Sequence, residues 1–553
     1  MRRSLALVVV AVVAVAGLVV QLALGPVGTG SSESASPAAS GAAVVPVSPG
    51  ESASPVPGSG AASDSVGPSS SAPAPSPLPS GPITDVPIVP VISFRAPWTT
   101  TTADEVATVI AGGSDRYAAI ELISSEADAI AAAIGIDRAG AGDRLVTVRS
   151  ARRLATDLAG HRDRLAFVRA DEVGASVRAL GWDGRTLFGV DRVRRNAAWS
   201  LTARLPRDPG SGDAFQAKAT WTLVAGGDIL LDRGVAKAVK LEGKGVDYPW
   251  NGGTAEITSR YCCSSFGWRL PRAHRTGNAG GMGDLLRKAD LAVANFENPA
   301  PDSFSYHTHG TVFSADPKLI AGLRDAGIDA VSIANNHIGD AGRAGVVQTR
   351  RNLARYGIEA AGAGANRAQA HQPAMLEADG VTVAILGYDS IARYYNAGSA
   401  TPGSARLTKG ALRRDVAAAR AAGADVVIVY PHWGTEYDPT PFSGQRSLAH
   451  DAIDAGADMV IGNHAHWAGA VEIYRGRPIW YALGTFVFDQ TWSEPTMEGM
   501  TLELTFRGSH LVQAWMHPHL ILGGAQPNFL DPGGDGRVVM GQVFAASKGM
   551  LPW

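Results

Sequence analysis

The sequence predicts an α/β protein in which a small α/β domain precedes a larger one. Two observations predict this class. The chain has 553 residues, which exceeds the roughly 100–200 residues of an ordinary domain. From about residue 86 onward, short apolar runs alternate with amphipathic helical patterns, as in proteins that place helices against sheets.

The first 24 residues predict a membrane anchor. Residues 5–24 form an apolar run that only Gly17 and Gln21 interrupt, and Arg2 and Arg3 precede it. This pattern favours a single bilayer-spanning helix oriented by the positive-inside rule. A cleaved signal peptide is the alternative, although no small-x-small cleavage site is evident. Both alternatives place the bulk of the chain outside the cytoplasm, and the first places the protein in the cell membrane.

Residues 25–85 predict a disordered linker. The segment is rich in Ser, Pro, Ala and Gly, as in "SSSAPAPSPLPSGP". Such a composition buries too little apolar surface to offset the entropy lost on ordering, so we expect a stalk stiffened by proline.

Residues 86–208 predict the small α/β domain. Strand patterns such as "VPIVPVISF", "YAAIELIS" and "RLVTVRS" alternate with helical patterns such as "TTADEVATVIAG" and "SEADAIAAAIG". The order of these units loosely resembles a lobe of the periplasmic solute-binding proteins. That resemblance carries no ligand residue, so it suggests a fold and, at most, solute sensing as a function.

Residues 220–507 predict the larger α/β domain, and residues 508–553 a Gly-rich tail of loops. The expected strands are "TLVAGGD", "LAVANFE", "DAVSIANN", "VTVAILGYDS", "DVVIVYPHWG", "DMVIGNHAH" and "PIWYALGTFVFD". Helical patterns between them include "DPKLIAGLRDAG", "AGVVQTRRNLARYG", "LRRDVAAARAAG" and "GQRSLAHDAIDAG".

Charge and cysteine content exclude some functions. The net charge is −2 and 18% of residues are charged, so no strong field indicates a nucleic-acid partner. The two cysteines, Cys262 and Cys263, are adjacent and cannot close a loop, which leaves two thiols or a vicinal disulfide.

Polar side chains follow five of the expected strands. In open α/β sheets, ligands bind beyond the carboxyl ends of the strands. Each of these residues alone could have a structural role. A purely structural explanation would, however, have to apply independently at all five strand ends. The residues are Asp228, Asn295 with Glu297, Asn335 to His337, His432 with Glu436, and His464 with His466.

These residue types predict a metal site. Carboxylates with imidazoles suit zinc, manganese or iron, and the set could hold one or two ions. We expect His464 and His466 to lie on one face of an extended segment. A divalent ion lowers the pKa of bound water, and His337, next to the potential ligand Asn336, could transfer the proton.

Six motifs together resemble the CapA family, which is associated with capsule and poly-γ-glutamate synthesis and is similar to calcineurin-like metallophosphoesterases. They are "GGDILLDR", "ANFENP", "ANNHIGDAG", "YPHWGTEY", "IGNHAHW" and "YALGTFVFDQ", in that order. The resemblance implies a layered, metallophosphoesterase-like α/β domain.

The resemblance also implies roles. It makes His337 the catalytic histidine and implies two overlapping groups of metal ligands, which share Glu297. The first group is Asp228, Glu297 and His466, and the second is Glu297, Asn336, His432 and His464.

Three departures from the family patterns are present. Leu230 stands where metallophosphoesterases usually have a histidine, which puts a full dinuclear centre in doubt. "NHAH" replaces the usual "HHPH", and Thr485 replaces an asparagine, but neither change removes a proposed ligand.

Several further residues could surround the site, each with a structural role equally open. Asp340 and Glu436 are candidates to assist catalysis beside His337, whereas Arg233, Tyr437 and the strand residue Asn295 could bind substrate. Asp489 could orient an imidazole.

Two functions follow from the resemblance. The first is a membrane-anchored extracytoplasmic hydrolase that uses a divalent metal to cleave a phosphoester or a bond of an envelope polymer. The second is a non-catalytic accessory protein that assembles, tethers or exports poly-γ-glutamate or another anionic capsular polymer with membrane partners of capsule synthesis. The run "RLPRAHR", residues 269–275, could face such a polymer or only water.

Overall fold

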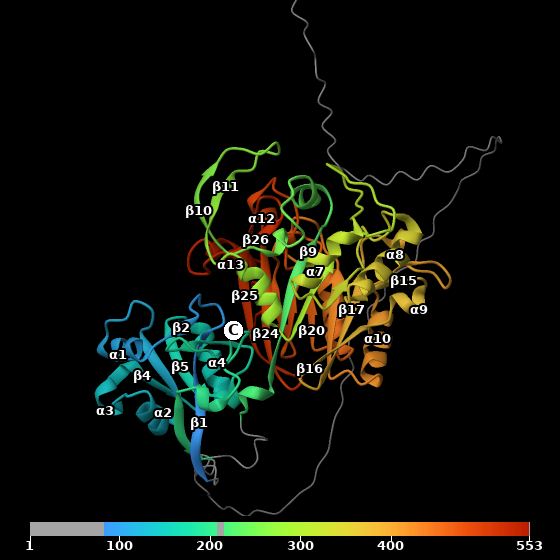
Figure 1. Cartoon of the computed structure of the whole chain (residues 1–553). Helices are drawn as coiled ribbons and strands as arrows, with labels where there is room; N and C mark the ends of the chain where they lie inside the picture. Colours follow the sequence, from blue (N-terminus) through green and yellow to red (C-terminus); the bar gives the residue numbers. More distant parts are fainter. Residues whose placement is uncertain (1–81, 207–214, 552–553) are drawn as a thin grey trace, which may run out of the picture. The chain divides into compact units, whose positions relative to one another are not determined.

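A computed structural model describes residues 82–206 and 215–551 (Figure 1). The chain divides into two units, Met1–Pro75 and Ser76–Trp553, and the first lies entirely outside the described residues. The expected anchor, residues 1–24, and nearly all of the expected linker therefore lie outside them as well. Across the two described ranges, no helix is both long and apolar enough to cross a membrane.

The small α/β domain contains a mixed six-stranded sheet. Its strands run in the order β4-β3-β5-β1-β6, and β8 also pairs with β1. β3 is parallel to β4 and β5, whereas β1 is antiparallel to its neighbours. The strands are β1 (Ile83–Ser93), β3 (Ala119–Ile123), β4 (Leu145–Val148), β5 (Arg164–Arg169), β6 (Val177–Ala179) and β8 (Thr202–Pro206), with a short pair β2 (Thr100–Thr101) and β7 (Gly181–Trp182).

Helices of the small domain begin where the sequence supplies capping side chains. Thr102 accepts a hydrogen bond from the Glu105 N–H, and Ser150 accepts one from the Arg153 N–H, which satisfies amide groups that the first turn leaves free. The helices are α1 (Ala103–Ala111), α2 (Ala127–Ala133), α3 (Arg138–Ala141) and α4 (Ala151–Gly160).

The larger domain contains a ten-stranded sheet. Its order is β11-β10-β26-β25-β24-β9-β12-β13-β14, with β23 beside β9. Its strands are β9 (Thr220–Ile229), β10 (Thr254–Tyr261), β11 (Leu270–Gly277), β12 (Leu291–Phe296), β13 (Ala330–Ser332), β14 (Glu359–Ala361), β23 (Thr485–Val487), β24 (Glu498–Arg507), β25 (His510–Leu522) and β26 (Gln526–Phe529).

A second, six-stranded sheet has the order β16-β17-β19-β20-β22-β21. Its strands are β16 (Ala374–Ala378), β17 (Val381–Asp389), β19 (Val426–His432), β20 (Met459–Ile461), β21 (Val471–Tyr474) and β22 (Arg477–Trp480), and a separate short pair is β15 (Ala363–Gly364) with β18 (Gly403–Ser404). The helices of this domain are α5 (Arg233–Ala236), α6 (Gly281–Lys288), α7 (Ile320–Asp325), α8 (Gly342–Arg355), α9 (Arg367–Ala370), α10 (Lys409–Ala421), α11 (Ser443–Asp454), α12 (Glu494–Met497) and α13 (Gly536–Ala546).

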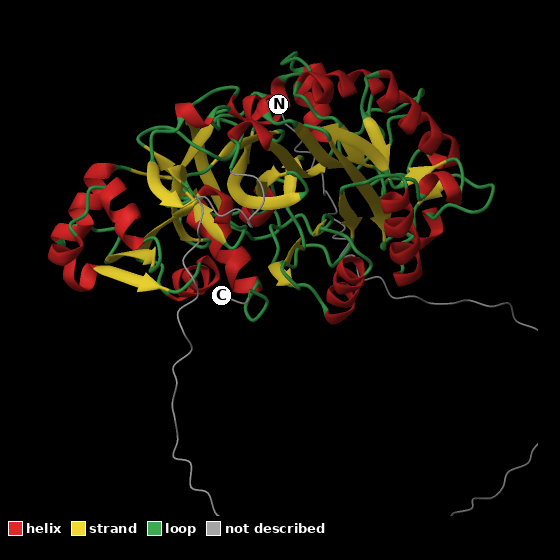
Figure 2. Ribbon diagram, turned by 90° about the horizontal axis from the view of Figure 1, so that it is seen from below, coloured by secondary structure: helices red, strands yellow, loops and turns green. Residues whose placement is uncertain are grey.

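The two sheets pack face to face, with helices on their outer faces. Leu223 of β9 and Ile428 of β19 belong to one apolar cluster between the sheets. Their neighbours point the other way: Val224 packs with residues of α6, α7 and α8, and Val429 packs with residues of α10 and α11. Alternate side chains of a strand face opposite sides, so helix, sheet, sheet and helix form four layers. Figure 2 shows the helices around the strands.

Two expectations about this domain need correction. The tail after residue 507 is not a set of loops, because β25, β26 and α13 lie in it and β25 pairs with β24. The expected single strand "PIWYALGTFVFD" is two strands, β22 and β23, which belong to different sheets. The domain is therefore built on two sheets, and the turn at Gly484 (φ 77°) carries the chain from one to the other.

The β10–β11 hairpin carries the two cysteines and the basic run. Cys262 and Cys263 form a vicinal disulfide between the strands. Within the run of residues 269–275, Arg275 donates to Asn528 (3.3 Å) and Gln526, and Arg272 lies over the Tyr261 ring. Two of the arginines of this run, Arg272 and Arg275, therefore interact with other side chains of the protein.

Candidate metal centre

The carboxyl ends of parallel strands from both sheets meet at one place. Asp228 lies near the end of β9, and Asn295 lies beside it in the register of β12. Glu297 follows β12, and His432 ends β19 in the other sheet. Asp228, Glu297 and His432 are fully buried. The packing of the two sheets thus brings polar side chains into an interior position.

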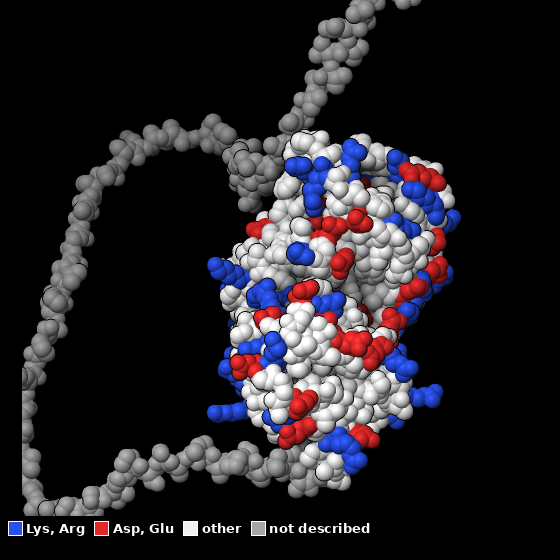
Figure 3. Space-filling model, turned by 90° about the vertical axis from the view of Figure 1, so that its left-hand side faces the viewer, with Lys and Arg blue, Asp and Glu red and all other residues white. Residues whose placement is uncertain are grey.

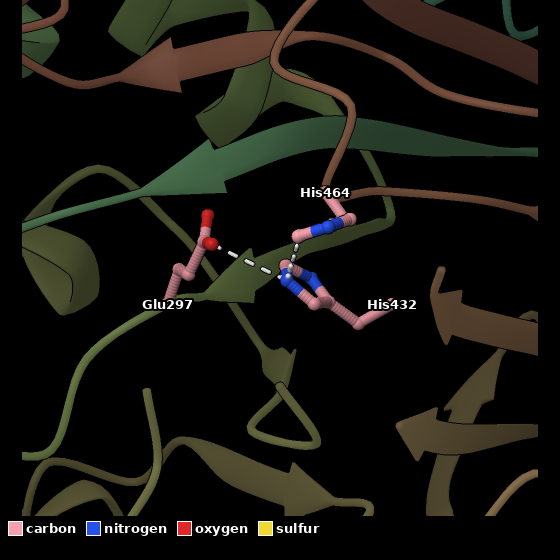
Figure 4. Close-up of side chains that lie close together, drawn as sticks. All are labelled: Glu297, His432 and His464. Carbon is pink, nitrogen blue, oxygen red and sulfur yellow. Dashed lines mark hydrogen bonds and ion pairs between the residues drawn. The ribbon is translucent and has the colours of Figure 1, made fainter. Parts of the chain in front are cut away.

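One group of possible ligands is Glu297, His432 and His464 (Figure 4). Their ligand atoms all lie within 4.8 Å of one another. His432 Nε2 is 3.2 Å from Glu297 Oε1 and 3.0 Å from His464 Nδ1. The two ring nitrogens and the carboxylate oxygen therefore face a common point.

The other group is Asp228, Glu297 and His466. His466 Nδ1 lies 3.1 Å from Asp228 Oδ2, and His466 Nε2 lies 3.8 Å from Glu297 Oε1. Glu297 belongs to both groups, so its carboxylate lies between two sets of imidazoles. Asn295 Nδ2 donates to Asp228 Oδ1 (2.7 Å) and contacts His432 Nδ1 (3.1 Å), which fixes the orientation of both side chains.

The Glu297 carboxylate fits a metal ion. Both of its oxygens are buried, and neither accepts a hydrogen bond from any described residue. An unsatisfied buried carboxylate is strongly unfavourable, whereas coordination of a cation would satisfy it. The surrounding imidazoles and Asp228 complete a donor set suited to zinc, manganese or iron.

Asn336 presents its amide oxygen to the same place. Its Oδ1 lies 2.7 Å from His432 Nε2, and its Nδ2 donates toward His337 Nε2 at 3.0 Å. The neighbouring histidine thereby sets the orientation of the amide. The oxygen is the atom that could join the second group of ligands.

His337 is held by Asp340. The Nδ1 atom of His337 lies 2.9 Å from Asp340 Oδ2, so Nδ1 carries the proton and Nε2 has the free electron pair. Asp340 also accepts hydrogen bonds from the Phe313 N–H (2.9 Å) and the Tyr395 hydroxyl (3.3 Å). The Phe313 ring packs against the imidazole at an angle of 38°, with centroids 4.1 Å apart. These contacts fix one tautomer and one orientation.

The expectation of an extended His464-x-His466 segment is wrong. Both residues follow β20 with positive φ, 92° for His464 and 55° for His466. The left-handed backbone turns the two imidazoles toward different partners, His432 in one case and Asp228 in the other. Such conformations are uncommon outside glycine, and they often occur at functional sites.

Leu230 contributes no ligand. Its side chain is fully buried in an apolar cluster with Phe313, Phe488 and Ile521. The position where the related motif usually has a histidine is therefore part of the core beside the site.

Buried charges shift the pKa values of the group. Burial alone would raise the pKa of Asp228, but the hydrogen bond and charge of His466 outweigh it and lower that pKa. Burial opposes the charged form of His466 as well, yet Glu297 and Asp228 raise its pKa to about 9. Burial and neighbouring imidazoles lower the pKa of His464 well below its ordinary value. The carboxylates of Asp228 and Glu297 thus stabilise positive charge close to them.

The remaining predicted residues lie around this centre. Arg233 donates to Asp489 (3.1 Å) and to the Gly310 carbonyl (2.9 Å), and its guanidinium lies 5.0 Å from the centre of the Phe313 ring. The Tyr437 ring lies 6.2 Å from that of His466, whereas Glu436 is exposed. Burial, followed by the charge of Glu436, raises the pKa of Tyr437.

An aromatic wall beside the centre was not anticipated from the sequence. It consists of Tyr437, Trp467, Trp492, Trp268 and Phe266. Tyr437 contacts Trp492 (centroids 4.8 Å apart), and Trp268 lies 6.0 Å from Trp467 and 6.3 Å from Trp492. Phe266 is 71% exposed and Trp268 39% exposed. The rings come from four separate segments, so no local periodicity could have indicated them.

Comparison with known proteins identifies the larger domain. Residues 222–490 match the family described as "Bacterial capsule synthesis protein PGA_cap". These residues form a CapA-like domain. The matched residues include every proposed metal ligand.

Curated relatives agree with this assignment. The chain is 32% identical over 216 residues to the Bacillus anthracis "Capsule biosynthesis protein CapA" and 33% identical over 213 residues to the Bacillus subtilis "PGA biosynthesis protein CapA". Each alignment covers 38% of this chain, and the chain spans 53% and 56% of these relatives, about half their length. A Mycobacterium tuberculosis protein named "Probable polyglutamine synthesis accessory protein" is 29% identical over 48% of this chain and 74% of its own length.

Solved structures show more distant likeness. A 5′-nucleotidase precursor from Thermus thermophilus aligns with TM-score 0.33 and 14% identity over 60% of this chain and 58% of its own. The Haemophilus influenzae NAD nucleotidase aligns with TM-score 0.32 and 12% identity over 60% and 63%. Scores of this size carry no argument about the chemistry of the CapA-like domain.

Proposed function

We propose that this CapA-like protein is an extracytoplasmic, membrane-anchored hydrolase that uses a divalent metal to cleave a phosphoester or a bond of an envelope polymer. The observation that carries the proposal is the Glu297 carboxylate, buried without a hydrogen-bond donor and shared by two groups of ligands. An ordinary structural carboxylate at such a depth would accept hydrogen bonds.

The chain would hold one or two ions through Asp228, Glu297, Asn336 and the three histidines His432, His464 and His466. A bound divalent ion would supply an acidified water and neutralise charge on the reacting oxygen. His337 Nε2 is the atom that would take or give a proton, because Asp340 holds the proton of Nδ1. The aromatic wall and Arg233 would position the substrate.

An accessory role without turnover is the second candidate. It is favoured by the name of the mycobacterial relative, which describes an accessory protein of polymer synthesis. In this role the domain would bind an anionic polymer, such as poly-γ-glutamate, together with membrane partners of capsule synthesis. On the face shown in Figure 3, basic and acidic side chains are interspersed and form no continuous basic band.

Metal analysis and turnover assays separate the two candidates. The full-length protein, its His464→Ala and His337→Ala variants and a control, His510→Ala, would be assayed for bound metal, phosphodiesterase activity and γ-glutamyl hydrolase activity. His510 is an exposed histidine of β25 outside the centre. We expect His464→Ala to lose metal and His337→Ala to keep metal but lose turnover. Stoichiometric metal in His464→Ala would overturn the ligand assignment, and metal without any turnover in the unmodified protein would favour the accessory role.

The location of the protein has its own test. The apolar run of residues 5–24 supports anchoring, and replacing Val9 and Val13 by Asp should release the chain from the membrane fraction because charges at the bilayer centre are unfavourable. Retention in the membrane fraction of both the native and the substituted chain would argue against this anchor.

A further inference from the structure

An arginine pocket lies between the small domain and helix α13. Its volume is about 330 Å³, and its lining includes four arginines, Arg95, Arg162, Arg178 and Arg537, together with Phe544. No aspartate or glutamate is among its lining residues. The arginines come from the loop after β1, the loop before β5, strand β6 and the first turn of α13. Folding therefore gathers four cations from distant parts of the chain.

Arg178 is the central observation. Only 4% of the residue is exposed, and its Nε atom is buried with no hydrogen-bond partner among the described residues. Burial is the one cause that shifts the pKa of Arg178, which falls to about 10, so no neighbouring carboxylate offsets the desolvation. A buried guanidinium without a counter-ion is unfavourable, and proteins rarely keep one without a use.

The other cations strengthen the local positive field. Arg95 and Arg162 both line the pocket, and burial, followed by the charge of Arg162, lowers the pKa of Arg95. Arg537 lies at the N-terminal end of α13, where the helix dipole adds partial positive charge. Arg537 donates to the Gly533 carbonyl, which keeps its side chain near the helix start.

We propose that the arginine pocket binds a multiply charged oxyanion. Guanidinium groups bind the paired oxygens of phosphates and carboxylates through two parallel hydrogen bonds, and several of them around one pocket favour more than one negative charge. A volume of about 330 Å³ suits a small ligand of this class. Two sources share the chemistry: a phosphate compound, or adjacent carboxylates of a γ-glutamyl chain. The pocket shares no residue with the metal centre, so the inference does not rest on the proposed function.

Binding of two probes tests the inference. Calorimetric titrations of the full-length protein would use inorganic pyrophosphate in one arm and a penta-γ-glutamate peptide in the other. All proteins would carry His464→Ala, so that pyrophosphate bound at a loaded metal centre does not contribute. The variants are Arg178→Met and Arg537→Gln, and the matched control is Arg413→Gln, which removes an exposed charge from α10.

We expect saturable binding of at least one probe, weakened at least about tenfold by Arg178→Met and by Arg537→Gln and unchanged by Arg413→Gln. The probe that binds identifies the source. Without probe, Arg178→Met should melt about 2 °C higher or more, because it removes a buried charge that has no partner. Arg537 is exposed, so its variant stays informative if Arg178→Met fails to fold. The absence of saturable binding for both probes, or equal affinity in Arg537→Gln, would overturn the proposal.

Discussion

The metal centre and the arginine pocket both bury charge, but they differ in what surrounds it. In the metal centre, the Glu297 carboxylate lies 3.2 Å from His432 and 3.8 Å from His466, and these imidazoles can carry positive charge. In the arginine pocket, no acidic residue is among the lining residues. The first region contains both signs of charge, whereas the second is lined by cations without an acidic residue. The sign of the unsatisfied group therefore indicates the ligand: a cation in one region and an anion in the other.

The largest expected effect is a loss of metal affinity when the metal centre is changed. Glu297→Gln removes the carboxylate that both groups of ligands share, so metal affinity should fall by more than about 100-fold. Metal analysis and calorimetric titration with Zn²⁺ or Mn²⁺ would measure it, with the exposed Glu377→Gln as the matched control. Oxyanion binding in the arginine pocket should not change. Retained stoichiometric metal would show that Glu297 is a structural carboxylate.

Within the metal centre, substitutions should separate the residues that bind the ion from the residue that transfers the proton. His337→Ala should reduce turnover about 100-fold or more at unchanged metal content, because the residue would transfer a proton and is not in either group of ligands. Asp340→Asn should have a smaller effect and change the pH dependence of turnover, since Asp340 sets the tautomer of His337. Loss of metal from His337→Ala would contradict this separation.

His519 is a third buried group, and both of its ring nitrogens have hydrogen-bond partners within the protein. It therefore serves as a comparison with the two regions in which a buried group lacks such partners. His519 Nε2 donates to the Thr485 carbonyl (2.8 Å), and Nδ1 accepts from Thr501 (3.1 Å). Burial is the main cause that lowers its pKa to about 4. The neutral form is therefore favoured in the fold, and its contribution is present above pH 6.5 and is lost as the pH falls toward 4.

Denaturant unfolding at several pH values would measure this contribution. We expect the free energy of unfolding to decrease by up to about 3 kcal/mol from this residue between about pH 6.5 and 4. The decrease should be smaller in His519→Asn than in the unmodified protein. The same slope in both proteins would show that His519 is not the group that titrates.

The smallest effect is expected at the aromatic wall. Trp268→Ala removes a partly exposed ring from the β10–β11 hairpin, so it should raise KM about tenfold with little change in kcat or stability. Phe544→Ala removes an aromatic ring from the arginine pocket instead. This substitution should leave KM unchanged, because the arginine pocket shares no residue with the metal centre. A lower kcat at unchanged KM in Trp268→Ala would mean that the ring acts on the reacting atoms rather than on substrate binding.

The sequence predicted much of the fold because local patterns carry local information. Apolar runs marked β9, β12, β17 and β19, and the helical pattern "TTADEVATVIAG" marked α1. The patterns did not reveal that β22 and β23 belong to different sheets, or that β25 enters the ten-stranded sheet. Those facts depend on pairing between distant segments, which periodicity does not describe.

By itself, the sequence determined which residues could bind a metal and in what order they occur, because Asp228, Glu297, His432 and the later histidines follow apolar strands. Only the tertiary structure decided that Glu297 is shared by two groups, and that four arginines spread from Arg95 to Arg537 line one pocket. The physical reason is the packing of layers. Apolar side chains between two sheets fix where the strand ends meet, and the residues at those ends lie close together only once that core has formed.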